Sequence, residues 1–401
     1  MSTNMSATPE LIERLERVQM RALIAGVIGL AAGFAAWAVW PVHFFPAYLV
    51  GFLYWLGISL GCVGLTMLHH LVGGSWGLVI RRPLESGAMN VLPLAVLFVP
   101  IAFGISSLYP WARGGSADHA AVGEHTLYLS ESFFLIRAGI YFVIWIAMGL
   151  IINGLSNRQD ATTNVAPSHW LQGIAGPGIV LLFLAATFSA IDWGMALDAK
   201  WTSTIYGVML IIGDALATLA LTIAIAGLLA ADKPMSEIAT PGRLNDLGNL
   251  MLAFVMLWAY MSFCQFLIIW SGNLSEEIPW YLRRTRGGWE WVALSLIVFN
   301  FFLPFFVLLF RSNKREATKV SRVALWILFM HWVNLVWLVV PASTDPSSPH
   351  ILWPQVFLSA LLTVGIGGIW IAFTVHWLKR RPLVPLHDPN LIEALEHAGG
   401  H

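Results

Sequence analysis

Ionisable side chains occur inside stretches that are otherwise apolar. Asp214 lies in IIGDALATLA and His331 lies in FMHWVNLVW. Such residues are costly inside a membrane and commonly mark proton or ion paths. We therefore expect Asp214 and His331 to carry protons near the middle of a bilayer. The alternative is a packing role, with Thr218 one turn beyond Asp214 and with Asn334 on the same helix face as His331.

Other polar candidates lie closer to the ends of apolar stretches. We expect an inner proton path to use Asp214 together with either His331 or His69, which lies at the end of TMLHH. The outer path would use three residues near the opposite side, Asp192, Glu131 and Arg137. Each has a structural alternative as well. His69 would be interfacial, Arg137 would pair with Glu131 or with an acid on a neighbouring helix, and Asp192 would cap a surface helix.

The sequence contains no pattern for a bound redox centre. Cys62 and Cys264 are isolated and lie within apolar stretches, and no CxxCH or closely spaced cysteine pair occurs. Such spacings are needed for haem attachment or for an iron–sulfur cluster. We therefore predict no metal site and no catalytic residue, and no cofactor held covalently or by metal ligands.

The elements that position these residues are predicted to be membrane helices. The 401 residues are 58% hydrophobic and 11% charged with zero net charge, which favours membrane lipids as neighbours and gives no support for nucleic-acid binding. We expect an all-α integral membrane protein with an amphipathic N-terminal segment at 1–20, a membrane domain at 21–378 and a polar tail at 379–401. Ten spans are predicted, at 21–39, 47–71, 88–107, 133–153, 172–190, 204–230, 248–271, 291–310, 322–341 and 353–378.

The distribution of basic residues predicts the topology. Most lie on the side of the N-terminus, including the clusters at 311–322 and 379–381. By the positive-inside rule, both termini are expected in the cytoplasm. Ten spans also allow two four-helix groups of the same orientation, helices 2–5 and helices 6–9, with helices 1 and 10 outside them.

The connector at 272–290 is predicted to lie on the outer side. It is rich in charges and is flanked by tryptophan and tyrosine, which favour the membrane interface. We expect it to dock partner subunits through its acidic and basic side chains; the alternative is an ordinary interfacial loop. The predicted docking residues are Glu276, Glu277, Arg283, Arg284 and Arg286.

Several segments resemble one known family. FVMLWAYMSFCQFLIIWSGNLSEEIPWYLRR and IDWGMALDAKWTSTIYGV, with SWGLVIRRPLE and FFLIRAGIYFVIW, resemble an NrfD-like membrane subunit of alternative complex III, a bacterial quinol:cytochrome c or electron-carrier oxidoreductase. The likeness covers helices 2 to 10. It implies two four-helix bundles and a place in the bacterial inner membrane. Implied partners are a second NrfD-like subunit, multihaem and monohaem cytochrome c subunits and an iron–sulfur subunit.

The resemblance also implies a division of labour. Haems and iron–sulfur clusters would be in the partners, quinol oxidation in the sister subunit, and assembly and proton half-channels in the subunit resembled here, which carries a quinone-binding name. Two alternatives remain. In one, the chain itself binds and oxidises quinol near Asp192 and His169. In the other, it is a stand-alone secondary transporter with helices broken at Pro100, Pro177 or Pro304.

Overall fold

The computed structural model describes residues 8–113, 128–162, 164, 166–198, 200–344, 349–388 and 391. Parts of the predicted segments 1–20 and 379–401 therefore lie outside the described residues. The described part is helical and contains no β-strand. Its elements are α1 (Pro9–Val39), α2 (Pro41–Val72), η1 (Gly77–Val79), α3 (Arg81–Ala88), α4 (Val91–Leu97), α5 (Val99–Phe103), α6 (Ile105–Leu108), η2 (Pro110–Ala112), α8 (Glu131–Ala161), α9 (Ala166–Trp193), η4 (Met195–Leu197), α10 (Tyr206–Leu229), α11 (Met235–Ile238), α12 (Pro241–Gly272), α13 (Ile278–Arg284), α14 (Trp289–Ser295), η5 (Leu296–Phe302), α15 (Leu303–Leu309), α16 (Arg311–Arg315), α17 (Ala317–Val339), η6 (Val340–Ser343) and α18 (Trp353–Leu378).

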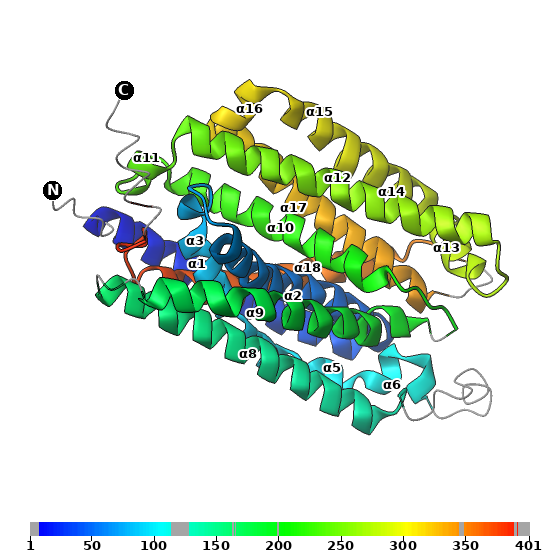
Figure 1. Ribbon diagram of the computed structural model, residues 1–401. Helices are drawn as coiled ribbons and strands as arrows, with labels where there is room; N and C mark the ends of the chain where they lie inside the picture. The colour runs from blue at the N-terminus through cyan, green and yellow to red at the C-terminus, as the bar shows by residue number, and fades with distance from the viewer. Residues whose placement is uncertain are drawn as a thin grey trace.

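Ten helical stretches of the described chain are long and apolar enough to cross a membrane. This finding confirms the predicted count and supports an all-α, multi-pass membrane protein. The helices run roughly side by side, with connections at two ends (Figure 1). We use the term terminal face for the end where α1 begins and α18 finishes, and connector face for the end that holds residues 273–288.

Three spans differ from the predicted elements. α1 begins at Pro9, so the amphipathic segment and the first span form one helix. The third span is divided into short helices, and Pro100 stands at the start of α5, where its missing N–H costs no helical bond. In the eighth span, Pro304 follows the π-helical segment η5. Pro177, by contrast, lies within the continuous helix α9.

α2 is the central helix of the described structure. Most of its length is buried, and it contacts α3, α9, α10, α17 and α18. Residues of α2 are therefore within reach of both the earlier and the later spans.

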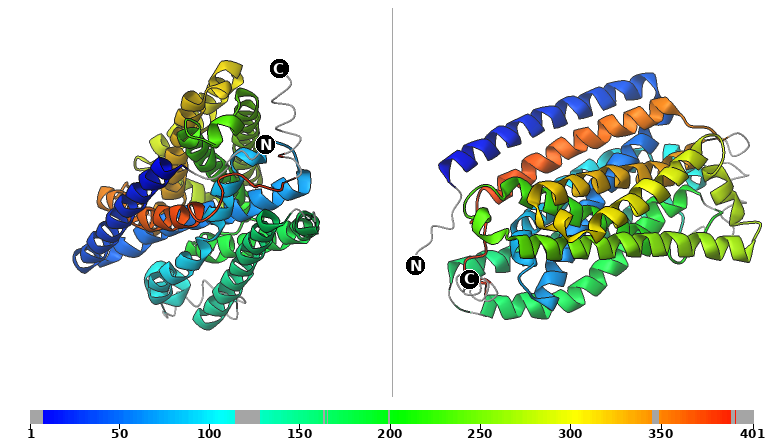
Figure 2. Two further views of the ribbon diagram at one scale, coloured as in Figure 1. Left: turned by 90° about the vertical axis from the view of Figure 1, so that its left-hand side faces the viewer. Right: turned by 90° about the horizontal axis from the view of Figure 1, so that it is seen from above.

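α1 lies at the edge and packs chiefly on α18 (Figure 2). The contact is made of glycines. A Cβ added at Gly26 would lie 2.7 Å from the backbone nitrogen of Ile369, and one added at Gly29 would lie 2.9 Å from the Cα of Gly365. Small residues allow membrane helices to approach closely enough for backbone contact.

Candidate functional site

The most deeply placed acidic and imidazole groups lie next to each other. Asp214 of α10 and His331 of α17 are separated by 3.2 Å between Oδ1 and Nε2, and both side chains are largely buried. Nε2 has no aligned hydrogen bond to any described residue, so the contact is an ion-pair distance rather than a well-formed hydrogen bond. The structure thus brings together two residues that the sequence singled out separately.

Helix α2 supplies the third wall of this site. A Cβ at Gly57 would lie 2.2 Å from Oδ1 of Asp214, and one at Gly61 would lie 2.1 Å from Oγ1 of Thr218. The two glycines therefore provide the space for these side chains. The Tyr54 ring lies 5.5 Å from the His331 ring, and its hydroxyl donates to the carbonyl of Leu328 over 3.2 Å.

The predicted packing partners occupy different positions. Thr218 donates to the backbone carbonyl of Asp214 at 2.7 Å and so leaves the carboxyl group available to His331. Asn334 is buried one turn after His331 and lines a separate apolar cavity described below. The acid–imidazole contact between two helices could not be read from the spacing within either helix.

A second buried pair lies near the connector face. Arg137 of α8 donates from Nε and Nη2 to the two carboxylate oxygens of Asp192, at 2.8 and 2.9 Å. Tyr141 donates to the same carboxylate at 2.8 Å. The acid on the neighbouring helix is therefore the partner of Arg137, and Asp192 is a buried residue in the last turn of α9, rather than the cap of a surface helix.

Glu131 is not part of this pair. Its side chain is exposed at the first residue of α8. The guanidinium of Arg137 instead lies over the rings of Tyr128 and Phe133, with 3.9 and 4.5 Å to the ring centroids. Of the three predicted outer residues, the structure brings two together and leaves the third on the surface.

A charged cluster at the terminal face was missed by the sequence interpretation. Glu85 accepts from Arg81 and from Arg82, each over 2.7 Å, and Arg82 also donates to Asp160 at 2.5 Å. Arg81 additionally pairs with Asp388. The spacing RRPLE, which places an acid three and four residues after two arginines, is the signal that could have revealed the pairing.

His69 lies beside this cluster and far from the central pair. It is buried, its ring stands edge-on to Trp76 at 5.3 Å, and its Nδ1 has no hydrogen bond to a described residue. Gly57, which contacts Asp214, lies about 18 Å from His69 along α2. The inner path therefore has its predicted residues at two separate depths.

The connector residues fall into two groups. Glu276 and Arg286 are exposed, and Glu277 is partly exposed. Arg283 pairs with Asp198 at 3.1 Å. These residues are positioned at or near the surface of the connector face.

Arg284 corrects the prediction of a uniformly exposed docking surface. It is only 1% exposed, donates to the carbonyls of Trp280 and Leu338 at 3.1 and 2.6 Å, and lies 3.7 Å from the centroid of the Trp280 ring. Burial lowers the pKa of Arg284 to about 9. Arg284 therefore joins α13 to the end of α17 and is unavailable to a partner.

The quinol site proposed around His169 and Asp192 is not assembled in the structure. Both residues belong to α9, but His169 lies in its first turn and Asp192 in its last. They are separated by about 35 Å along the helix axis. A single head group cannot contact both residues.

Metal-binding chemistry has no assembled ligand set in the described residues, where no group of three or more His, Cys, Asp or Glu side chains could hold an ion. Cys62 and Cys264 are both free thiols. The arrangement offers proton-exchanging and ion-paired groups at three depths. Neither the protein-family models nor the curated proteins compared with the chain match it.

Proposed function

We propose that the chain is an NrfD-like membrane subunit of an alternative complex III-type quinol-oxidising complex in a bacterial cytoplasmic membrane. In this proposal it contains no redox centre and moves protons through two half-channels. The observation that carries the proton-transfer part is the 3.2 Å contact between Asp214 and His331. A carboxyl group and an imidazole can exchange one proton near neutral pH, where imidazole titrates.

The packing of the helices supports the bundle arrangement. α2 contacts α3, α4, α8 and α9, while α10 contacts α12 and α17. These contacts are compatible with bundles formed by spans 2–5 and 6–9, while α18 packs directly on α2 and α3 of the first bundle and α1 packs on α18. The central pair belongs to the second bundle and meets the first through Gly57 of α2. Proton movement at the pair would therefore occur where the two bundles meet.

The charge distribution supports the orientation. The basic clusters at 311–322 and 379–381 lie at the terminal face, which would be cytoplasmic by the positive-inside rule. The Arg137–Asp192 pair would then face the outer half and the His69 region the inner half. Cytochrome and iron–sulfur partners would dock at the connector face through Glu276, Glu277, Arg283 and Arg286.

The proton-transfer function is tested in the whole complex. We expect Asp214→Asn and His331→Gln each to lower proton uptake per quinol oxidised, because each removes one member of the exchanging pair. Proton uptake and quinol oxidation are measured together in vesicles. Thr222→Val is the matched control, since Thr222 is buried on α10 and donates only to backbone carbonyls. Unchanged proton stoichiometry in both variants would remove the pair from the path.

Membership of the complex is tested separately by purification of the tagged chain. We expect cytochrome c absorbance and an iron–sulfur subunit to purify with it. A chain that purifies alone and carries out solute transport would instead support the transporter alternative.

A further inference from the structure

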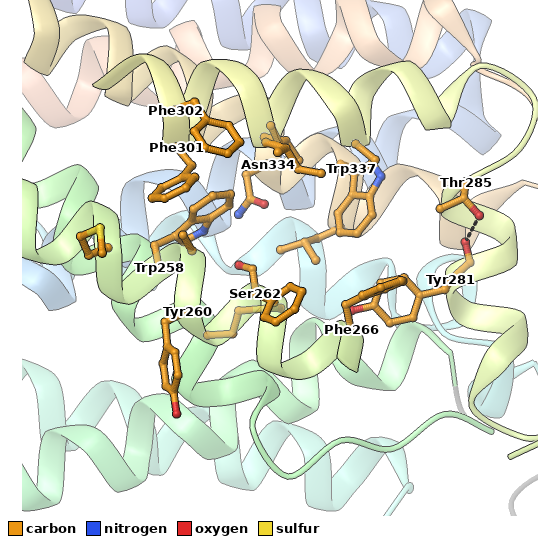
Figure 3. Close-up of a pocket in the computed structure, with 18 of the residues that line it drawn as sticks. Trp258, Tyr260, Ser262, Phe266, Tyr281, Thr285, Phe301, Phe302, Asn334 and Trp337 are labelled. Carbon is orange, nitrogen blue, oxygen red and sulfur yellow. Dashed lines mark hydrogen bonds between the residues drawn. The ribbon is translucent and has the colours of Figure 1, made fainter. Parts of the chain in front are cut away.

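A cavity of about 590 Å³ lies between α10, α12, α13, α14, η5 and α17 (Figure 3). Its volume falls within the range of small-molecule sites. None of the described side chains that line it is Asp, Glu, Lys, Arg or His, so these side chains offer no partner of opposite charge to a charged head group. Its lining includes Trp258, Ala259, Ser262, Trp280, Phe301 and Asn334.

The mouth of the cavity opens onto an apolar outer surface. Met256, Tyr260 and Phe263 of α12 line it and are 45%, 62% and 59% exposed, whereas Trp258 and Trp280 are buried. Exposed apolar side chains along a membrane helix face hydrocarbon rather than water. An occupant would therefore enter sideways from the lipid phase.

Two of the polar groups that line the cavity, the Asn334 amide and the Ser262 hydroxyl, have no hydrogen-bond partner among the described residues. Asn334 is 7% exposed, and its amide makes no hydrogen bond to any described residue; the Ser262 hydroxyl likewise bonds to no residue in the described ranges. Figure 3 shows these side chains facing the same part of the cavity from α17 and α12. A buried amide is costly unless it is hydrogen-bonded. Both polar groups can donate to or accept from an oxygen-bearing ligand.

We propose that this cavity binds an uncharged amphiphile, with a compact carbonyl- or hydroxyl-bearing head at Asn334 and Ser262 and an apolar chain leaving past Met256 and Phe263. Asn334 and His331 are three residues apart on one helix face, with about 5–6 Å between their Cβ atoms. The head group would therefore lie beside the Asp214–His331 pair. The proposal rests on the cavity and is independent of the proton-transfer function.

Photolabelling tests the binding site in the full-length chain, within the complex with which it purifies. The probe is benzophenone carrying a decyl chain, which has an uncharged carbonyl head and an apolar tail. We expect its cross-links, mapped by peptide mass spectrometry, on the stretches of α12, η5 and α17 that line the cavity. Cross-links spread evenly over the lipid-facing helices would overturn the proposal.

Matched variants distinguish labelling inside the cavity from labelling elsewhere on the surface. Ala259→Phe adds a ring inside the cavity and should abolish the focused labelling, whereas Ala253→Phe adds the same ring at an exposed position of α12. Asn334→Leu should raise the half-saturating probe concentration about tenfold, the effect of losing one hydrogen bond of ordinary strength. Its control is Asn245→Leu, on α12 but outside the cavity. Wild-type labelling of Ala259→Phe and Asn334→Leu would overturn the proposal.

Competition identifies the source of the amphiphile. A decylbenzoquinone that displaces the probe indicates a quinone-type head, and dioctanoylglycerol that displaces it indicates a neutral glycerolipid. Equal displacement by dodecane, which has no head group, would contradict recognition by Asn334 and Ser262. The labelling does not depend on turnover, so its result stands apart from that of the proton-uptake experiment.

Discussion

Gly57 and Asp214 approach so closely that a Cβ on Gly57 would lie 2.2 Å from the Asp214 carboxylate. The glycine therefore determines whether the acid can occupy its position beside His331. This contact joins α2, the central helix, to the one acidic side chain of the central pair.

We expect Gly57→Ala to displace Asp214 and to destabilise the protein by about 1–3 kcal/mol, the usual cost of overpacking. The measurement is the midpoint of thermal unfolding in detergent, together with proton uptake by the complex. Gly139→Ala on α8 is the control, because its added Cβ would meet no atom within 4 Å. A Gly57→Ala protein as stable as the Gly139→Ala control would show that the helices separate at little cost.

Removing one member of the Arg137–Asp192 pair should destabilise the folded protein more than removing both members. Asp192→Leu or Arg137→Leu alone leaves a buried charge without its partner, which costs about 3–5 kcal/mol. The double variant Arg137→Leu/Asp192→Leu removes both charges and should recover part of that stability. Thermal unfolding of the four proteins in detergent provides the double-mutant cycle. Additive losses would mean that the pair contributes no coupling.

At the terminal face, Glu85→Gln should destabilise the fold far more than Glu16→Gln. Glu85 is buried and forms ion pairs with Arg81 and Arg82, whereas the Glu16 side chain is 58% exposed and pairs with Lys379. An exposed pair contributes at most about 1 kcal/mol. Limited proteolysis reports the change, because residues 379–388 contact this cluster through Asp388 and Arg381. Equal protection of the tail in both variants would contradict the assignment.

Arg284 and Arg286 should behave in opposite ways. Arg284→Gln removes the hydrogen bond to the carbonyl of Leu338, which joins α13 to α17, and should lower the unfolding midpoint of the chain. Arg286→Gln changes an exposed side chain and should leave the midpoint unchanged while weakening retention of extrinsic subunits during salt washes. If both variants lost extrinsic subunits and neither had a lower unfolding midpoint, Arg284 would belong to the docking surface after all.

The same residue gives a pH prediction. Because burial lowers the pKa of Arg284 to about 9, the unfolded chain keeps a proton above that pH that the folded chain releases. The free energy of unfolding should therefore increase as the pH rises through about 9. Unfolding measured from pH 7 to 10 should show this gain in the wild type and not in Arg284→Gln. A parallel pH dependence in the two proteins would exclude the titration.

The sequence predicted the positions of the spans better than the side-chain contacts between different spans. Apolar length alone marks the ten helices, but it placed the start of the third span at residue 88, whereas α3 begins at Arg81. Charged residues normally end a span; here Glu85, Asp160 and Asp388 together pair with Arg81 and Arg82, so that the buried helix can include both arginines. Which side chains of different helices pair with each other is harder to predict. The sequence predicted a role for both Asp214 and His331. Their contact depends on how α10 and α17 pack together beside Gly57 of α2. A single sequence does not specify that packing.

The glycine contact between α1 and α18 has a consequence for biogenesis. Among the ten described spans, α1 is synthesised before the others, and it packs chiefly on α18, which is synthesised after them. During synthesis, Gly26 and Gly29 therefore face lipid or insertion machinery until α18 arrives. Synthesis of α18, rather than insertion of α1 itself, is therefore the event that allows α1 to reach its final position. A truncation before Trp353 would leave α1 in the membrane without its principal neighbour.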